Sequence, residues 1–103
     1  MDDKQFNLIA KALSDPQRFA LLRRVAREEE VGCKTLVAQF PIRQATISHH
    51  MKELMTAGLV EGRRAGQCMY FRSRPDVLST YLREVQRRVS RTAPRKGPAA
   101  AKA

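Results

Sequence analysis

The stretch from Phe40 to Leu59, FPIRQATISHHMKELMTAGL, places the tightest constraint on how this chain can fold. Its apolar residues recur with the i, i+4, i+7, i+8 spacing of one buried helical face; these are Ile47, Met51, Leu54 and Met55. At about 100° per residue, the opposite side of the helix is small and polar; it carries Ala45, Ser48, His49, Lys52 and Thr56. Gly58 stands where a left-handed cap is expected, so the sequence predicts an amphipathic helix that ends near Ala57.

The polar side of this helix indicates contact with a nucleic acid. A helix kept on the surface only for solubility usually carries more Glu and Lys. Small residues let a helix enter a DNA groove closely, and Gln, Ser, His and Lys can bond base edges or phosphates. A brief helix over 35–40 precedes it across a turn at Pro41, which is the arrangement of a helix-turn-helix. The alternative interpretation is an ordinary amphipathic surface helix.

The charge of the chain favours a polyanionic partner. Its 103 residues include 20 basic and 10 acidic ones, which gives a net charge of +10. The segment 91–103 holds four basic residues and no acidic one, so +6 remains on residues 1–90. This Pro/Ala-rich segment predicts a basic disordered tail. We expect residues 1–90 to form one DNA-binding and dimerisation domain.

Two further helices are predicted before the helix-turn-helix. Over 4–13 the apolar side chains recur at i, i+3, i+4 and i+7. Asp15 suits an N-cap and Pro16 the first turn of a second helix, which should end near Arg27. Its predicted inward residues are Phe19, Leu22, Val25 and Ala26. Its arginines should lie mostly outward on a solvated face, with contacts to DNA phosphates as the alternative; they are Arg18, Arg23, Arg24 and Arg27.

A hairpin and a long helix complete the predicted fold. The runs 59–64 and 67–72 flank a turn at 64–66, and 31–33 can add a short strand. Arg63 and Arg64 near the tip should reach a minor groove or phosphates, with a purely solubilising charge as the alternative. Pro75 opens a last helix whose apolar seam either covers the domain's own core or pairs with a second copy, which we favour. The first helix should take part in this pairing. The predicted interface comprises Phe6, Ile9, Leu78, Tyr81, Leu82, Val85 and Val89.

The order of these elements and the wording of two motifs resemble the ArsR/SmtB family of bacterial repressors. KALSDPQRFALL is similar to the family's opening segment, and ATISHHMKELMTAGLVEGRRAGQCMYFR to its recognition helix and wing. The resemblance covers about residues 6–85. It implies a mostly α-helical winged helix-turn-helix with a small β-hairpin, in the order ααααββα, and a homodimeric repressor of a bacterial operon that binds double-stranded operator DNA. The implied DNA-facing residues are Arg43, Gln44, Ala45, Thr46, Ser48, His49, Lys52, Arg63 and Arg64, with Arg43 standing where the family commonly has Ser.

The family's usual metal sites look absent from this sequence. Where metal-binding members carry a CVC-type pair, this chain reads EVGCKTL, and the last helix offers Asp76 and Glu84 but no His. We therefore predict no metal and no cofactor. The adjacent His49 and His50 lie about 100° apart on a helix and cannot chelate one ion together. We expect His50 to be a satisfied structural residue.

The two cysteines leave two interpretations open. Free Cys is most often a small buried hydrophobe, which is the simpler interpretation for Cys33 and Cys68. In winged helices the strand before the short helix often pairs with the second wing strand. That pairing would bring the two sulfurs close enough for a redox switch, which stays a hypothesis here. The sequence identifies no other effector.

Other function classes fit the sequence less well. Two Cys and two His form no nucleophile–base arrangement, so we expect no enzyme. A non-specific, charge-driven architectural protein is the main alternative, and the polar helix face, poor in Lys and Arg, argues against it. No apolar run approaches the roughly 20 residues that span a bilayer, and the start shows no secretion signal. We expect a cytoplasmic protein associated with the bacterial nucleoid and not with a membrane.

Overall fold

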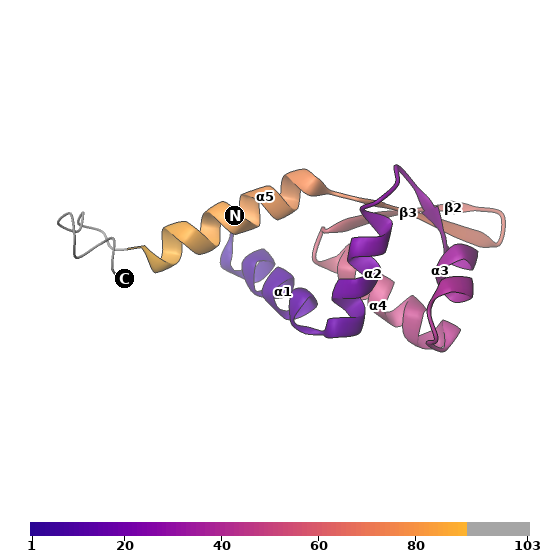
Figure 1. Ribbon diagram of the computed structural model, residues 1–103. Helices are drawn as coiled ribbons and strands as arrows, with labels where there is room; N and C mark the ends of the chain where they lie inside the picture. The colour runs from indigo at the N-terminus through magenta and orange to yellow at the C-terminus, as the bar shows by residue number, and fades with distance from the viewer. Residues whose placement is uncertain (91–103) are drawn as a thin grey trace.

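The computed structural model describes residues 1–90, which form a winged helix-turn-helix (Figure 1). The helices are α1 (Asp3–Ser14), α2 (Pro16–Val25), α3 (Cys33–Gln39), α4 (Gln44–Thr56) and α5 (Pro75–Val89). The strands are β1 (Val31–Gly32), β2 (Val60–Ala65) and β3 (Cys68–Ser73). The predicted order of helices and hairpin is thereby confirmed. The predicted tail, 91–103, lies outside the described residues.

Capping residues set the helix boundaries. The Asp15 side chain accepts a hydrogen bond from the backbone N–H of Arg18 (3.0 Å), and Pro16 occupies the first turn of α2. Helix α2 ends at Val25, two residues before the predicted end, ahead of an acidic run that would oppose the dipole at a helix C-terminus. Gly58, with φ of +83°, follows the end of α4 in the left-handed conformation.

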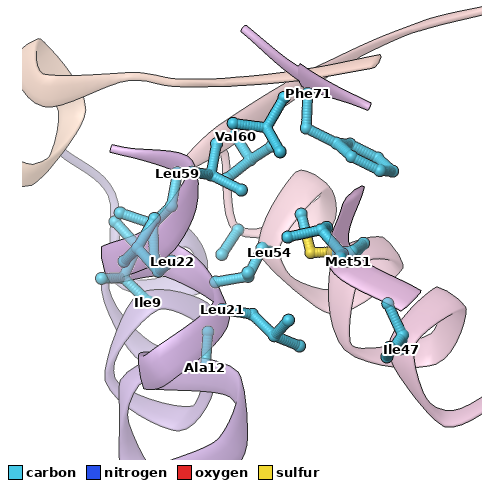
Figure 2. Packing of buried hydrophobic residues seen from close by; sticks show 14 residues of the cluster. Ile9, Ala12, Leu21, Leu22, Ile47, Met51, Leu54, Leu59, Val60 and Phe71 are labelled. Atoms are coloured by element: carbon cyan, nitrogen blue, oxygen red, sulfur yellow. The ribbon is translucent and has the colours of Figure 1, made fainter. Parts of the chain in front are cut away.

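The core lies between α1, α2, α4 and the base of the hairpin (Figure 2). Ile47, Met51 and Leu54 turn one side of α4 into this core, as predicted, while Met55 is half-buried. Figure 2 shows Ile9 of α1 and Leu21 of α2 in the same cluster. Helix α4 therefore has one side fixed by packing and one side left for solvent or a ligand.

The inward side of α2 differs from the prediction. Leu22 and Val25 are buried as expected, but Phe19 is 44% exposed and Ala26 is also exposed. The buried stripe is centred on Leu21, Leu22 and Val25, and at 100° per residue Phe19 and Ala26 lie about 100° from its centre. The prediction of Phe19 and Ala26 as inward residues is therefore wrong.

The four arginines of the predicted second helix divide into two pairs; Arg27 lies beyond the observed end of α2. Arg23 and Arg27 are exposed, as predicted. Arg18 is half-buried because it lies on the same stripe as Leu21 and Leu22. The Arg24 side chain is only 12% exposed; it donates to Gln39 Oε1 (2.7 Å) and forms an ion pair with Glu28 (2.6 Å). The outward prediction is wrong for Arg18 and Arg24.

The three strands form one antiparallel sheet in the order β1-β3-β2. Val31 pairs with Phe71, and Ala65 pairs with Cys68 at the end of the hairpin. The hairpin loop is therefore Gly66-Gln67, one residue later than predicted, and Gly66 adopts a positive φ of +63°. At the base of the hairpin the backbone N–H of Arg74 donates to the carbonyl of Leu59 (2.8 Å).

None of the helices within residues 1–90 is long and apolar enough to cross a membrane.

Candidate nucleic-acid interface

The outer side of α4 is open and polar. Its exposed residues are Arg43 at the N-cap and then Gln44, Ala45, Ser48, His49 and Lys52, while Thr46 is half-buried. Arg43 caps the helix without a side-chain hydrogen bond. Across residues 1–90, the side chains of Gln44, Ser48 and Lys52 donate no hydrogen bond to the protein, so their polar groups are available to a ligand.

A groove of about 440 Å³ separates α4 from the wing, the β2–β3 hairpin. Its floor is apolar and includes Ile47, Met51, Met55, Met69 and Phe71. Its rim is polar and carries Gln44, Ser48, Lys52, Arg64 and Gln67. Two cations beside uncharged hydrogen-bonding groups suit a sugar–phosphate backbone with base edges next to it.

The two wing arginines lie on opposite sides of the sheet. Successive residues of a strand point to opposite faces, and Arg64 lines the groove beside α4. Arg63 instead donates from Nε (3.1 Å) and Nη2 (2.7 Å) to the carboxylate of Glu30. Its guanidinium carbon also lies 4.9 Å from the centre of the Tyr70 ring. The structure therefore groups Arg64, but not Arg63, with the polar residues of α4.

His50 lies on the inner side of α4 and is 5% exposed. Its Nδ1 accepts from Nε of Arg18 (3.3 Å), so the ring hydrogen sits on Nε2, which faces Oε1 of Gln17 at 3.2 Å. Burial is the main cause that lowers the pKa of His50; Arg18 lowers it further, and Asp15 opposes the shift. The prediction of a satisfied structural histidine is confirmed. The hydrogen bond from Arg18 to His50 was not predicted. Arg18 lies on the same side of α2 as the buried Leu21 and Leu22, and this position could have indicated an inward partner.

The cysteines are both free and half-buried. Cys33 is the first residue of α3 and not, as predicted, a buried strand residue. Gly32 pairs with Tyr70 in the antiparallel register, so continuing the register places Met69, and not Cys68, opposite Cys33. Because neighbouring strand residues point to opposite faces, the register does not direct the Cys68 side chain toward Cys33. Cys33 lines the groove between α4 and the wing.

The acidic residues of α5 that could ligate a metal are engaged in ion pairs. Asp76 accepts two hydrogen bonds from Arg74 (3.1 and 3.0 Å). Hydrogen bonds from Arg87 and then Arg88 lower the pKa of Glu84 to about 2. In the part of the chain that the structure describes, no three or more His, Cys, Asp or Glu residues gather where they could hold an ion. The lack of a metal response stays a prediction.

The predicted dimer surface needs one correction. Ile9 is 0% exposed and belongs to the core of the chain itself, so it offers no surface to a second copy. The predicted interface residues of α5 lie on one side of that helix, which projects from the body (Figure 1). Leu82 is 57% and Val89 79% exposed, and Leu78, Tyr81 and Val85 are half-buried. Phe6 of α1 packs against Tyr81, with ring centres 5.1 Å apart.

Comparison with known sequences matches residues 13–63 to the family described as "Helix-turn-helix domain". The chain is 31% identical to the arsenical resistance operon repressor of Staphylococcus aureus over 82% of this chain and 81% of that protein. It is 34% identical to the arsenic resistance transcriptional regulator ArsR1 of Pseudomonas putida over 68% of this chain, and spans only 55% of that relative.

Solved structures share the fold. An ArsR-like transcriptional regulator from Rhodococcus sp. RHA1 has a TM-score of 0.74 and 25% identity, covering 82% of this chain and 78% of that one. The winged helix-turn-helix domain Mb0332 from Mycobacterium bovis, described as homodimeric and DNA-binding, has a TM-score of 0.67 and 23% identity, covering 94% and 97%. This chain therefore belongs to the ArsR family of winged helix-turn-helix, DNA-binding transcriptional regulators.

Proposed function

We propose that this protein is a homodimeric repressor that binds double-stranded operator DNA, with α4 in the major groove and the wing beside it. The observation that carries the proposal is the division of α4 into a buried apolar side and an exposed polar side. The proposed DNA contacts are Arg43, Gln44, Ala45, Thr46, Ser48, His49 and Lys52 of the helix-turn-helix and Arg64 of the wing.

The distribution of charge favours sequence-specific binding over charge-driven coating. The chain carries a net charge of +10, which attracts DNA in a salt-dependent way. The exposed middle of α4 nevertheless presents only one fixed cation, Lys52, among small and uncharged groups. Such groups read base edges, whereas a non-specific binder needs mainly phosphate contacts.

The exposed side of α5 supports pairing with a second copy. Leu78, Leu82, Val85 and Val89 repeat at i, i+4, i+7 and i+11, which makes a continuous apolar seam. Two copies joined there would present two α4 helices to half-sites about 34–36 Å apart. The description of the M. bovis neighbour as a homodimer and the name of the S. aureus relative as a repressor agree with this arrangement.

A thiol response remains a hypothesis within this proposal, centred on Cys33 alone. Cys33 borders the groove between α4 and the wing, so a group attached to its sulfur would project where the DNA backbone is proposed to lie. The register of β1 and β3 gives no comparable support to a disulfide with Cys68.

The decisive experiment compares two variants on two DNA duplexes. The test variant is Ser48→Ala/His49→Ala/Lys52→Ala, and the control is Arg23→Ala/Arg27→Ala, which removes more charge from exposed positions on α2 and in the turn after it. Fluorescence anisotropy measures binding to a duplex from upstream of the protein's own coding sequence and to a scrambled duplex of equal composition.

We expect the test variant to lose operator affinity at least about 100-fold, because each of the three contacts contributes about 1–3 kcal/mol. Its thermal unfolding should match the wild type, and the control should bind nearly normally. Equal binding of both duplexes by the wild type, with the larger loss in the control, would instead establish the non-specific alternative. A test variant that binds the operator as well as the wild type would refute the role of α4.

A further inference from the structure

The outer side of the sheet, facing away from α4, carries a cluster that the proposed DNA contacts do not use. We call Glu30, Arg63 and Tyr70 the wing clasp. Arg63 meets both carboxylate oxygens of Glu30, with Nε at 3.1 Å from Oε2 and Nη2 at 2.7 Å from Oε1. The same guanidinium lies over the Tyr70 ring. This combination of a two-bond ion pair and a cation–π contact orients a guanidinium more closely than a single contact would.

The wing clasp joins all three strands of the sheet. Glu30 immediately precedes β1, Tyr70 lies in β3 and Arg63 lies in β2. Tyr70 pairs with Gly32 on one side and with Arg63 on the other, so Gly32, Tyr70 and Arg63 form one row across the sheet. Glu30 lies two residues before Gly32. A Cβ at Gly32 would lie 3.1 Å from Cε1 of Tyr70, and the glycine therefore makes room for the ring.

The wing clasp adds a link on the outer side of the sheet, whereas Met69 packs against the core from the inner side. The β2–β3 hairpin projects beyond the helices (Figure 1), and a two-stranded hairpin alone is marginally stable. Its buried anchors, Val60 and Phe71, lie toward its base. The Arg63–Tyr70 pair lies two residue pairs from the loop, and β1 contributes only two residues to the sheet.

The wing clasp supports the strand orientation that points Arg64 into the groove. When Arg63 is held on the outer side, the alternation of a strand directs Arg64 into the groove, where it lines the rim with Lys52 and Gln67. A slip of one residue in the register of β2 would exchange these two orientations.

We infer that Arg63 is a positioning residue held by Glu30, and that Arg64 makes the wing's contact with the DNA backbone. This inference rests on the proposed function, because it concerns how the same DNA-binding surface is oriented. It assigns Glu30, an acidic residue outside the proposed DNA contacts, a positioning role in DNA binding.

The slope of log K against log salt separates a positioning arginine from a phosphate contact. Losing one phosphate contact reduces this slope by about 1. We expect Arg64→Gln to reduce the salt slope by about 1. Arg63→Gln and Glu30→Gln should each lower operator affinity about 3- to 10-fold with the wild-type slope, and the double variant should bind no more weakly than either single variant.

A charge exchange gives the second readout. In Glu30→Arg/Arg63→Glu the ion pair is restored with its partners reversed, and we expect affinity to return to within about threefold of the wild type. If Arg63 instead contacts a phosphate, a glutamate at that position repels DNA, and the exchange variant binds more weakly than Arg63→Gln. Thermal unfolding of each variant confirms that the chain is folded.

Three results would overturn the inference: a slope change in Arg63→Gln equal to that in Arg64→Gln, a gain in affinity for Glu30→Gln, or no rescue by the charge exchange. The α4 triple variant, measured alongside, distinguishes the two levels of failure. If that variant binds like the wild type, the proposed function fails; if it loses binding while Arg63 behaves like Arg64, only the wing-clasp inference fails.

Discussion

His50 of α4 accepts a hydrogen bond at Nδ1 from Nε of Arg18 of α2 over 3.3 Å. The bond joins the inner side of the proposed recognition helix to the helix behind it. Gln17 meets the other ring nitrogen at 3.2 Å, so both nitrogens of a neutral imidazole are used. We therefore expect a substitution at His50 to change how α4 packs against α2, although His50 itself does not face the proposed DNA.

Stability should fall at acidic pH because of His50. Burial lowers the pKa of His50 below 6.5 in the folded chain, so the unfolded chain takes up the proton more readily. The free energy of unfolding is then fully developed above pH 6.5 and decreases as the pH falls from there through the folded-state pKa. Urea unfolding between about pH 5 and 8 measures this slope.

The matched control for this prediction is the neighbouring exposed histidine. His49→Gln should keep the acid slope, whereas His50→Gln should reduce it. A His50→Gln variant that keeps the full slope would assign the acid sensitivity to another group, since Asp15, Arg18, His49 and Glu53 all surround the ring.

Arg18→Ala should destabilise the fold by about 1–3 kcal/mol, because it leaves a buried acceptor on His50 without its donor. Arg23→Ala, at an exposed position of the same helix, should change stability by less than about 0.5 kcal/mol. Chemical denaturation at pH 7.5 measures both variants. Equal effects would show that the Arg18–His50 bond contributes nothing beyond a surface arginine.

Leu82→Glu/Val89→Glu should convert the protein to a monomer, because the two side chains are among the most exposed apolar residues in the described part of the chain. Light scattering after size exclusion measures the mass, and anisotropy should show weaker operator binding. Phe19→Glu is the control, since it places a charge on another exposed apolar residue, 44% exposed, on α2. Loss of the dimer in the control as well would point to general destabilisation.

N-Ethylmaleimide should weaken operator binding at least about tenfold through Cys33, which lines the groove beside Lys52 and Arg64. Cys33→Ser should bind DNA normally and resist the reagent, whereas Cys68→Ser should remain sensitive. Mass spectrometry confirms which sulfur is alkylated. Full affinity of a protein alkylated at Cys33 would exclude this groove as a DNA-facing surface.

The features that were predictable from the sequence depend on neighbouring residues. Helical periodicity identified the buried side of α4, and local capping identified Asp15 and Gly58 as boundaries. Periodicity failed on α2, where Phe19 and Leu21 are both apolar and only packing against α1 and α4 decides which one turns inward. Local spacing shows that residues share a side, but not which side the rest of the chain covers.

The missed contacts join residues far apart in sequence. Arg18 and His50 are separated by 32 positions, and Glu30 and Arg63 by 33. Each arginine has an unremarkable local sequence, and its partner is set by how helices and strands cross in space. Ile9 was assigned to a partner surface for the same reason: the spacing of an apolar stripe does not distinguish a domain's own core from an interface.

The hydrogen bond from Arg74 to Leu59 has a consequence for how two copies would grip DNA. Leu59 follows the end of α4 and opens the wing, while Arg74 immediately precedes α5. Helix α4, the wing and α5 therefore meet at one hydrogen-bonded junction. In the proposed dimer, the angle of α5 at this junction would set the distance between the two α4 helices, so a tilt of α5 by a few degrees would move both helices out of register with successive turns of the DNA.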